Sequence, residues 1–320
     1  MIFKKIFLVL ISFFLLTTAF SQPCFKTIFV KGFTNNTLEV LDWGGKGRPI
    51  LFISGLGNTA HVFEDFAPKF INDYHVYGMT RRGFGKSERT NIGFDTDTLV
   101  KDITKVLNYI GLKKIILIGH SIAGDEISTF ARTFPNKILA TVYLDAALNH
   151  SYDDSILGKS PQKPSPPNDF KPTLNNLEED YFKSHGFYFP IGEINNSWGK
   201  FDNNRLLVND TTTYYGFTKI IQALKPITYK NIKCPSLAIY VKAPTAPDRF
   251  KAYDLFDSTN KRIAEEALPR WTNYYTTEIE RYKKECSNCK VEEILGAHHV
   301  IFLSHPKETE ILIRNFLKNL

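Results

Sequence analysis

One stretch of the sequence, IILIGHSIAG at residues 115–124, indicates the fold. Its first four residues are all apolar, as expected of a strand that is buried on both faces of a parallel sheet. A helical pattern follows, so Ser121 occupies a tight turn between a strand and a helix. Large side chains beside the serine would clash in such a turn, which explains Gly119 and Ala123. The turn raises the serine hydroxyl above the sheet and directs the helix N-terminus, with the amide of Ile122, toward it.

The rest of the chain alternates short β-rich runs with helical patterns, which favours an α/β fold with a parallel sheet and crossover helices. The clearest helix precedes residue 115, where Leu99, Ile103, Val106 and Ile110 recur at helical spacing and Gly111 ends the pattern. We expect eight strands, at Thr27–Val30, Leu38–Leu41, Ile50–Ser54, His75–Met79, Lys114–Ile118, Ala140–Leu144, Ser236–Val241 and Val291–Leu295.

Two further loops lie where predicted strands end. The loop Ser54-Gly55-Leu56-Gly57-Asn58 follows the third strand, and its Gly-flanked backbone can present an amide to an oxyanion without obstruction. The loop Gly296-Ala297-His298-His299 follows the last strand, and a histidine there can reach over the sheet and take the proton of the serine. The pattern therefore brings a serine, a Gly-rich loop and a histidine to one edge of the sheet.

With these motifs, the chain resembles the α/β-hydrolase superfamily over nearly all of its length outside residues 148–233. The turn around Ser121 is similar to the family's G-x-S-x-G motif, with Ala123 in place of the second glycine. The loop that begins at Ser54 resembles the family's oxyanion loop, with serine replacing the usual histidine. Thr80–Ser87 resembles its Arg-Gly-x-Gly-x-Ser loop, for which we expect a structural role.

The resemblance implies a mostly parallel eight-stranded α/β-hydrolase sheet flanked by helices, with an inserted cap. It also implies an oxyanion hole formed by the amides of Leu56 and Ile122. Residues 148–233 break the alternation of strands and helices, contain a proline-rich stretch and are rich in aromatic residues, so we assign the cap to them. The hydrolase core then comprises residues 22–147 and 234–320.

The catalytic base follows from the same resemblance. Alignment on Leu303 and His305-Pro306 assigns it to His299 rather than to His298, which stands where the family commonly has glycine. The resemblance implies that this histidine, the serine and a buried acid form the catalytic triad typical of such hydrolases.

The acid has two candidates, because the usual slot after the strand at Ser236–Val241 contains no carboxylate. Asp145 ends the sixth predicted strand and is preferred, since some branches of the superfamily take their acid from that position. Asp248 is the alternative, and it requires its loop to fold back. Either choice keeps the chain order serine, aspartate, histidine.

These features predict a serine hydrolase that acts on a small-molecule carboxylic ester or amide through an acyl-enzyme. No metal or organic cofactor is implied. One alternative is a peptidase similar to proline iminopeptidases, for which Glu178, Glu179 and Asp180 could bind a peptide amine. Another is a non-catalytic ligand-binding protein on the same scaffold.

Residues 1–21 are typical of a signal peptide. Lys4 and Lys5 precede an apolar run, and Ala19 and Ser21 precede a cleavage site. The run is shorter than the ~20 residues of a transmembrane helix, so we expect no stable membrane span after cleavage. The protein is therefore expected to be exported, either periplasmic or secreted.

Charge and cysteine content bear on two further functions, nucleic-acid binding and redox catalysis. The formal charge of +7 comes from scattered Lys and Arg residues, which argues against a nucleic-acid partner. Cys286 and Cys289 form a C-x-x-C pair between a charged helical stretch and a strand. At that place a structural disulfide or two idle thiols is favoured over redox catalysis.

Overall fold

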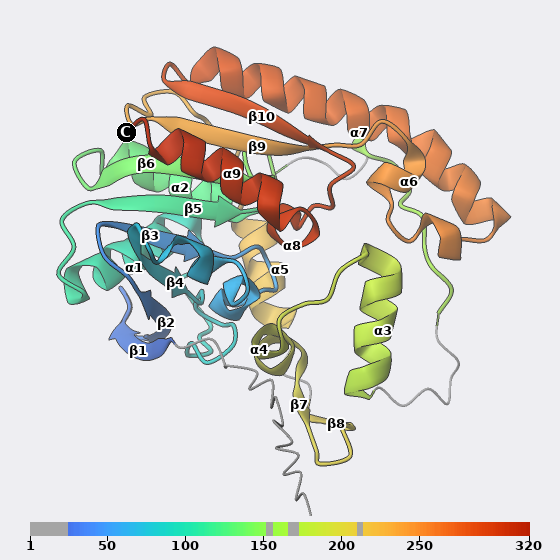
Figure 1. The fold of residues 1–320 in the computed structure, drawn as a ribbon, viewed down its shortest axis with the longest axis horizontal. Coiled ribbons are helices and arrows are strands. Elements are labelled where there is room, and N and C mark those ends of the chain that lie inside the picture. Colours follow the sequence, from blue (N-terminus) through green and yellow to red (C-terminus); the bar gives the residue numbers. More distant parts are fainter. Residues whose placement is uncertain (1–24, 152–155, 166–172, 210–213) are drawn as a thin grey trace, which may run out of the picture.

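The computed structural model describes residues 25–151, 156–165, 173–209 and 214–320, so the predicted signal peptide lies outside the described residues. Within them, eight strands form one sheet in the order β1-β2-β4-β3-β5-β6-β9-β10 (Figure 1). β2 runs antiparallel to both of its neighbours, whereas β4, β3, β5, β6, β9 and β10 are mutually parallel. The predicted mostly parallel eight-stranded sheet is therefore confirmed. Its strands are β1 (Lys26–Lys31), β2 (Thr37–Gly44), β3 (Arg48–Ile53), β4 (Tyr74–Met79), β5 (Ile115–His120), β6 (Ile138–Leu144), β9 (Ser236–Lys242) and β10 (Cys289–Leu295).

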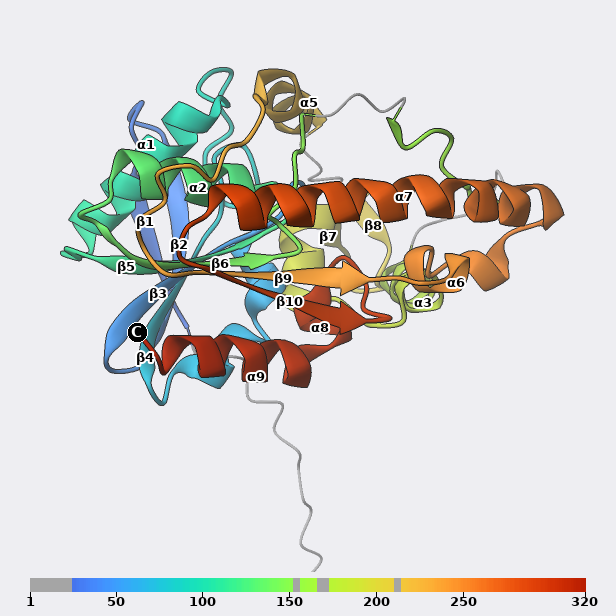
Figure 2. The same ribbon diagram turned by 90° about the horizontal axis from the view of Figure 1, so that it is seen from above.

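Helices cover both faces of this sheet (Figure 2). One face carries α1 (Thr96–Tyr109), α2 (Ala123–Thr133) and the long α7 (Ser258–Glu285). The other face carries α9 (Pro306–Leu317) with the short elements η1 (Ala60–Phe63), η2 (Ala67–Phe70) and α8 (Ile301–Ser304). Two short elements, α6 (Ala246–Arg249) and η5 (Tyr253–Leu255), precede α7.

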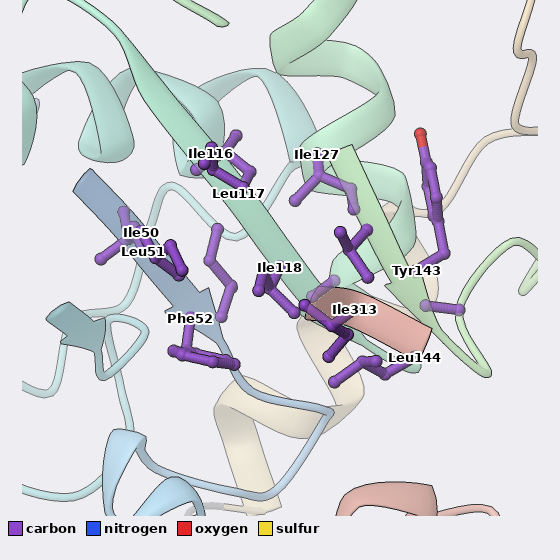
Figure 3. Close-up of a cluster of buried hydrophobic side chains, with 14 of the residues drawn as sticks. Ile50, Leu51, Phe52, Ile116, Leu117, Ile118, Ile127, Tyr143, Leu144 and Ile313 are labelled. Atoms are coloured by element: carbon purple, nitrogen blue, oxygen red, sulfur yellow. The ribbon is translucent and has the colours of Figure 1, made fainter. Parts of the chain in front are cut away.

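The core lies between these layers. Side chains of β3, β5 and β6 meet there, and α2 and α9 close the two sides with Ile127 and Ile313 (Figure 3). The predicted run Ile115–Ile118 is fully buried, as a central parallel strand must be. Burial of each such side chain contributes about 1.5–3 kcal/mol.

The strand order gives a topological switch point at the carboxyl ends of β3 and β5. β3 lies between β4 and β5; the chain leaves β3 toward β4, whereas it leaves β5 in the opposite direction, toward β6. In open α/β sheets, ligands bind where the connections diverge in this way. The loop at Ser54 and the turn at Ser121 both begin at this switch point, directly after β3 and β5.

The chain between β6 and β9 forms a separate group of elements, which we call the inserted segment (residues 148–233). Figure 1 shows α3, α4 and the β7–β8 hairpin lying away from the sheet. The start of α3 is bridged to the hairpin by Thr173 and Leu206. Its role as a cap stays a prediction. The elements are α3 (Leu174–His185), α4 (Ile191–Glu193), η4 (Ile194–Trp198), β7 (Lys200–Phe201), β8 (Leu207–Asn209) and α5 (Tyr214–Ala223).

The C-x-x-C pair joins α7 to β10, with Cys286 directly after the helix and Cys289 as the first residue of the strand. Both thiols are free, and the Cys289 thiol donates to the carbonyl of Cys286 (3.0 Å). Burial, with Cys286 beside it, raises the pKa of Cys289 to about 12, whereas a reactive thiol needs a lowered pKa.

None of the described helices is both long and apolar enough to span a membrane.

Candidate active site

Ser121 occupies the turn between β5 and α2. Its φ is +53°, a left-handed conformation that is uncommon for residues with side chains and that clusters at functional sites. The amide of Ser121 donates to the carbonyl of Leu144 at the end of β6 (3.2 Å), which ties the turn to the next strand. The residue is partly exposed. The turn therefore presents a hydroxyl group at the carboxyl edge of the sheet.

Small residues allow α2 to approach the sheet closely beside this serine. A Cβ atom on Gly124 would lie 1.8 Å from the carbonyl oxygen of Ala146, and one on Gly119 would lie 3.2 Å from Cβ of Ala123. A side chain at residue 124 would therefore push α2 away from the end of β6. The steric reason predicted for residues 119 and 123 is present, and it applies most strongly to Gly124.

His299 and Asp145 meet at the same edge, although 154 residues separate them. Nδ1 of His299 lies 2.6 Å from Oδ2 of Asp145. The His299 side chain is 39% exposed, in the loop between β10 and α8, whereas Asp145 directly follows β6 and is fully buried. Asp145 also has a positive φ, of +47°. With Nδ1–H donating to the carboxylate, the neutral ring leaves Nε2 free to accept a proton.

Two further groups donate to the Asp145 carboxylate. Tyr275 on α7 donates its hydroxyl to Oδ2 (2.7 Å), and the amide of Val241 on β9 donates to Oδ1 (3.0 Å). Arg249 in turn donates to the Tyr275 hydroxyl (3.3 Å). Burial would raise the pKa of Asp145, but the hydrogen bond and charge of His299, the charge of Arg249 and the Val241 amide together lower it. The carboxylate is therefore ionised at neutral pH, as the partner of an imidazole should be.

His120, directly before Ser121, contacts the loop that contains His299. Its Nε2–H donates to the carbonyl of His299 (3.1 Å), and the two rings lie 4.8 Å apart. Burial and the charge of His299 lower the pKa of His120 to about 3, so this ring stays neutral. The serine turn and the histidine loop are therefore packed against each other.

His298 makes different contacts from its neighbour. Its Nδ1 accepts from the amide of Val300 (3.0 Å), and its ring packs against His185 and Phe187 of the inserted segment. Burial, with the nearby histidines, lowers the pKa of His298 to about 2. A base this weak is unsuited to taking a proton from a serine near neutral pH.

The other acidic candidates lie elsewhere. Asp248 caps the first turn of α6, where its exposed carboxylate accepts from the hydroxyl of Thr245 (2.5 Å), and no hydrogen bond joins it to His299 in the described residues. Glu178, Glu179 and Asp180 each form a surface ion pair with a lysine or arginine. The described part of the chain also contains no group of three or more His, Cys, Asp and Glu side chains suited to a metal ion.

The residues predicted to form the oxyanion hole share one apolar cluster. The side chains of Leu56 and Ile122 pack with Phe84 and Phe94 and with Ile220 of α5, in the inserted segment. The loop itself is closed internally, because the Ser54 hydroxyl donates to the carbonyl of Asn58 (2.9 Å). Both predicted amide donors thus belong to one packed unit that includes a helix of the inserted segment.

Comparison with known proteins agrees with this architecture. The model of the alpha/beta hydrolase fold family matches residues 48–223, more than half of the 320-residue chain. The chain belongs to the α/β hydrolase fold family. The match covers the oxyanion loop, the Ser121 turn and Asp145, and it confirms the family resemblance stated for the sequence.

Among its relatives, a non-heme chloroperoxidase of Streptomyces lividans is 31% identical over 108 residues, 33% of this chain and 39% of that protein. A bifunctional esterase/perhydrolase of Acinetobacter calcoaceticus is 28% identical over 109 residues, 33% of this chain and 40% of the relative. The chain thus spans less than half the length of these relatives. The crystal structure of E-2-(acetamidomethylene)succinate hydrolase covers 92% of this chain and 100% of its own with a TM-score of 0.64, and at 17% identity it shows a shared fold.

In this α/β hydrolase, Arg81 links the oxyanion loop to the helix after Ser121. The buried guanidinium donates to the carbonyls of Ser54 (3.0 Å) and Gly55 (3.4 Å) and, through Nε, to Glu126 on α2 (2.7 Å). A trans peptide points its C=O and N–H in opposite directions, so drawing the Gly55 carbonyl toward Arg81 turns the amide of Leu56 away from it. For the Thr80–Ser87 loop, which contains Arg81, the sequence predicts only a structural role. An arginine two residues after the buried strand β4 was the available signal for more.

Replacing Arg81 with methionine is expected to lower kcat by about 10²-fold, the cost of a displaced oxyanion donor. Arg82→Met is the matched control, because Arg82 forms an equally buried ion pair with Asp102 but contacts no part of the oxyanion loop. Each change leaves a buried carboxylate unpaired, so both should lose about 3–5 kcal/mol of unfolding free energy in urea titrations.

A double variant separates stability from activity at this site. In Arg81→Met/Glu126→Leu the unpaired carboxylate is gone, so stability should largely return while kcat stays low. Steady-state kinetics with a chromogenic ester measures kcat, and urea unfolding of the same variants measures stability. Recovery of kcat together with stability would show that Arg81 serves folding alone.

Proposed function

We propose that this chain is a serine hydrolase that cleaves a carboxylic ester or small amide through an acyl-enzyme. The observation that carries the proposal is the 2.6 Å contact between His299 and a fully buried, ionised Asp145. His120, the residue before Ser121, donates to the carbonyl of His299 (3.1 Å), and Ser121 itself is held at a positive φ. Burial of the charged carboxylate is costly, and hydrogen bonds from Tyr275 and Val241 as well as from His299 offset that cost.

In the proposed reaction, the hydroxyl oxygen of Ser121 attacks the carbonyl carbon of the substrate while Nε2 of His299 takes its proton. The amides of Leu56 and Ile122 donate to the oxyanion of the tetrahedral intermediate. The imidazolium then gives its proton to the leaving alcohol or amine as the bond to it breaks. Water, deprotonated by His299, attacks the acyl-enzyme and releases the acid and free Ser121.

Asp145 keeps the imidazole in the tautomer that this sequence requires. Its Oδ2 accepts from Nδ1–H of His299 in the resting state and stabilises the imidazolium after proton transfer. The Tyr275 hydroxyl and the Val241 amide hold the carboxylate in place, so it cannot turn away from the ring.

Ester substrates are favoured over peptides. The name of the Acinetobacter relative includes an esterase activity, and its matched stretch is similar to part of this chain. The peptidase alternative needs free acidic groups in the inserted segment, whereas Glu178 and Asp180 are paired with Arg205 and Lys163 at the surface.

A fluorophosphonate tests the proposal directly, because it reacts with activated serines. The folded protein should gain the mass of one adduct, and peptide mapping should locate the adduct on Ser121. p-Nitrophenyl esters should turn over faster than aminoacyl p-nitroanilides. No adduct on the folded protein, or an adduct at another residue, would refute the proposed nucleophile.

We also propose export, on the strength of the positive and apolar pattern in residues 1–21. Expression in a bacterial host should yield a chain outside the cytoplasm whose N-terminal sequence starts near Gln22. Retention of the full-length chain in the cytoplasm would contradict this.

A further inference from the structure

Glu193 is a fully buried carboxylate that the proposed mechanism does not use. It is the last residue of α4 in the inserted segment. Its Oε1 accepts from the side-chain amide of Asn58 (2.8 Å) and from the amide of Thr59 (3.2 Å), and its Oε2 accepts from the Thr59 hydroxyl. Within the described residues, all hydrogen bonds to this carboxylate come from the end of the oxyanion loop.

The residues that Glu193 holds take part in the internal hydrogen bonding of that loop. The amide of Asn58 donates to the carbonyl of Gly55 (3.3 Å), and the Asn58 carbonyl accepts from the Ser54 hydroxyl (2.9 Å). The amide of Leu56 lies within the short turn, residues 54–58, that these two hydrogen bonds close. A displacement of residue 58 is therefore transmitted to the peptide that carries the proposed oxyanion donor.

Arg81 and Glu193 hold opposite ends of the loop. Arg81, from the core, donates to the carbonyls of residues 54 and 55, whereas Glu193, from the inserted segment, accepts from the side-chain amide of Asn58 and the backbone amide of Thr59. The core alone therefore supplies only one of these two sets of contacts.

The backbone of α4 lies close to the side chain of Glu64. A Cβ atom on Gly192 would lie 2.1 Å from Oε1 of Glu64, so a side chain there would displace this carboxylate. The carboxylate of Glu64 is itself held by Nδ1 of His61 (2.5 Å), on η1. The packing of α4 against Glu64 therefore contributes to the position of Glu193.

We propose that Glu193 is a positioning residue whose carboxyl group ties the inserted segment to residues 58 and 59, so that the oxyanion hole is complete only while that segment is docked. The inference rests on the proposed function for its catalytic consequence. Docking of the segment, for example around a substrate, would then assemble the hole and select for substrates that permit docking.

The same contact responds to pH. Burial raises the pKa of Glu193 to about 7, although hydrogen bonds from Thr59 and Asn58 and the charge of His61 oppose the rise. An undocked, solvated Glu193 would ionise near 4.5, so docking weakens as pH rises from about 4.5 to about 7 and is constant above that range. Among the described residues, His61 on η1 and Tyr181 on α3 interact electrostatically with Glu193. Glu64 and Glu39 pair with His61, and Lys86 lies beside Glu39.

Three variants test the inference: Glu193→Ala, Glu193→Gln and, as an exposed control in the inserted segment, Lys183→Ala. Hydrogen exchange followed by mass spectrometry reports on the amides of residues 54–60 without any need for activity. In Glu193→Ala these amides should exchange faster, and the rate of acylation by the fluorophosphonate should fall by at least tenfold and up to about 10²-fold. Glu193→Gln, which keeps the shape and an acceptor, should retain most of the acylation rate, and Lys183→Ala should match the wild type in both measurements.

Unchanged exchange in Glu193→Ala, or faster exchange with an unchanged acylation rate, would overturn the inference. If the wild type is not acylated at all, the proposed function fails, while the exchange data still decide whether Glu193 holds the loop. The pH response has its own test in the difference in Tm between wild type and Glu193→Gln. Between pH 4.5 and 7 the Tm of the wild type should fall relative to that of Glu193→Gln. A difference in Tm that does not change with pH would refute the titration of Glu193.

Discussion

Ser121→Ala is expected to reduce ester turnover by about 10⁴-fold or more, the largest effect of any single change in this chain. The variant lacks the nucleophile, so no acyl-enzyme can form, and only binding and the oxyanion hole remain. Steady-state rates and fluorophosphonate labelling both measure the loss. Circular dichroism should show an unchanged fold, because the substitution removes only one oxygen atom at a partly exposed position.

Ser160→Ala is the matched control, because Ser160 is an exposed serine of the inserted segment. It should retain full activity. Combining Ser121→Ala with His299→Ala should cost little more than either change alone, since the two groups act as a unit. An active Ser121→Ala variant would mean that another residue attacks the substrate.

Asp145→Asn is expected to lower kcat by about 10⁴-fold while leaving the fold intact. An asparagine amide can turn its NH₂ toward Nδ1 of His299, which stabilises the tautomer with the proton on Nε2. The ring then cannot accept the proton of Ser121. Asparagine also tolerates the positive φ of +47° at this position, so backbone strain does not confuse the result.

Asp248→Asn is the corresponding control. It changes an exposed helix cap, for which a stability loss of about 1 kcal/mol or less and an almost unchanged kcat are expected. Both variants should be compared by kcat, KM and urea unfolding. A large loss of kcat in Asp248→Asn with little loss in Asp145→Asn would assign the acid to Asp248 and contradict the geometry.

The sheet was predictable because its signals are local. Buried strands such as Ile115–Ile118 are continuously apolar, and the amphipathic helix at Thr96–Tyr109 has regular spacing and a clear end. The turn around Ser121 needs small residues at set positions, so residues adjacent in the chain are enough to predict it. His299 could be nominated for the same reason, because it lies in a short loop after the last strand.

The inserted segment was harder to predict, because its stability comes from contacts that are distant in sequence. Its short elements lack long periodic patterns, and Glu193 resembles any surface glutamate until α4 is packed on η1. Tyr275 gives no signal either, since it reaches Asp145 from 130 residues away. Neither residue carries a motif that sequence spacing could reveal.

By itself, the sequence determined the α/β sheet, the turn that displays Ser121, the Gly-rich loop at residue 54 and the candidate base His299, since each depends on residues adjacent in the chain. The tertiary structure alone decided which aspartate meets His299, that Arg81 binds the oxyanion loop, and that Glu193 ties the inserted segment to it. These contacts join segments far apart in the sequence. Their energies depend on burial and hydrogen-bond geometry, which exist only after the chain has folded.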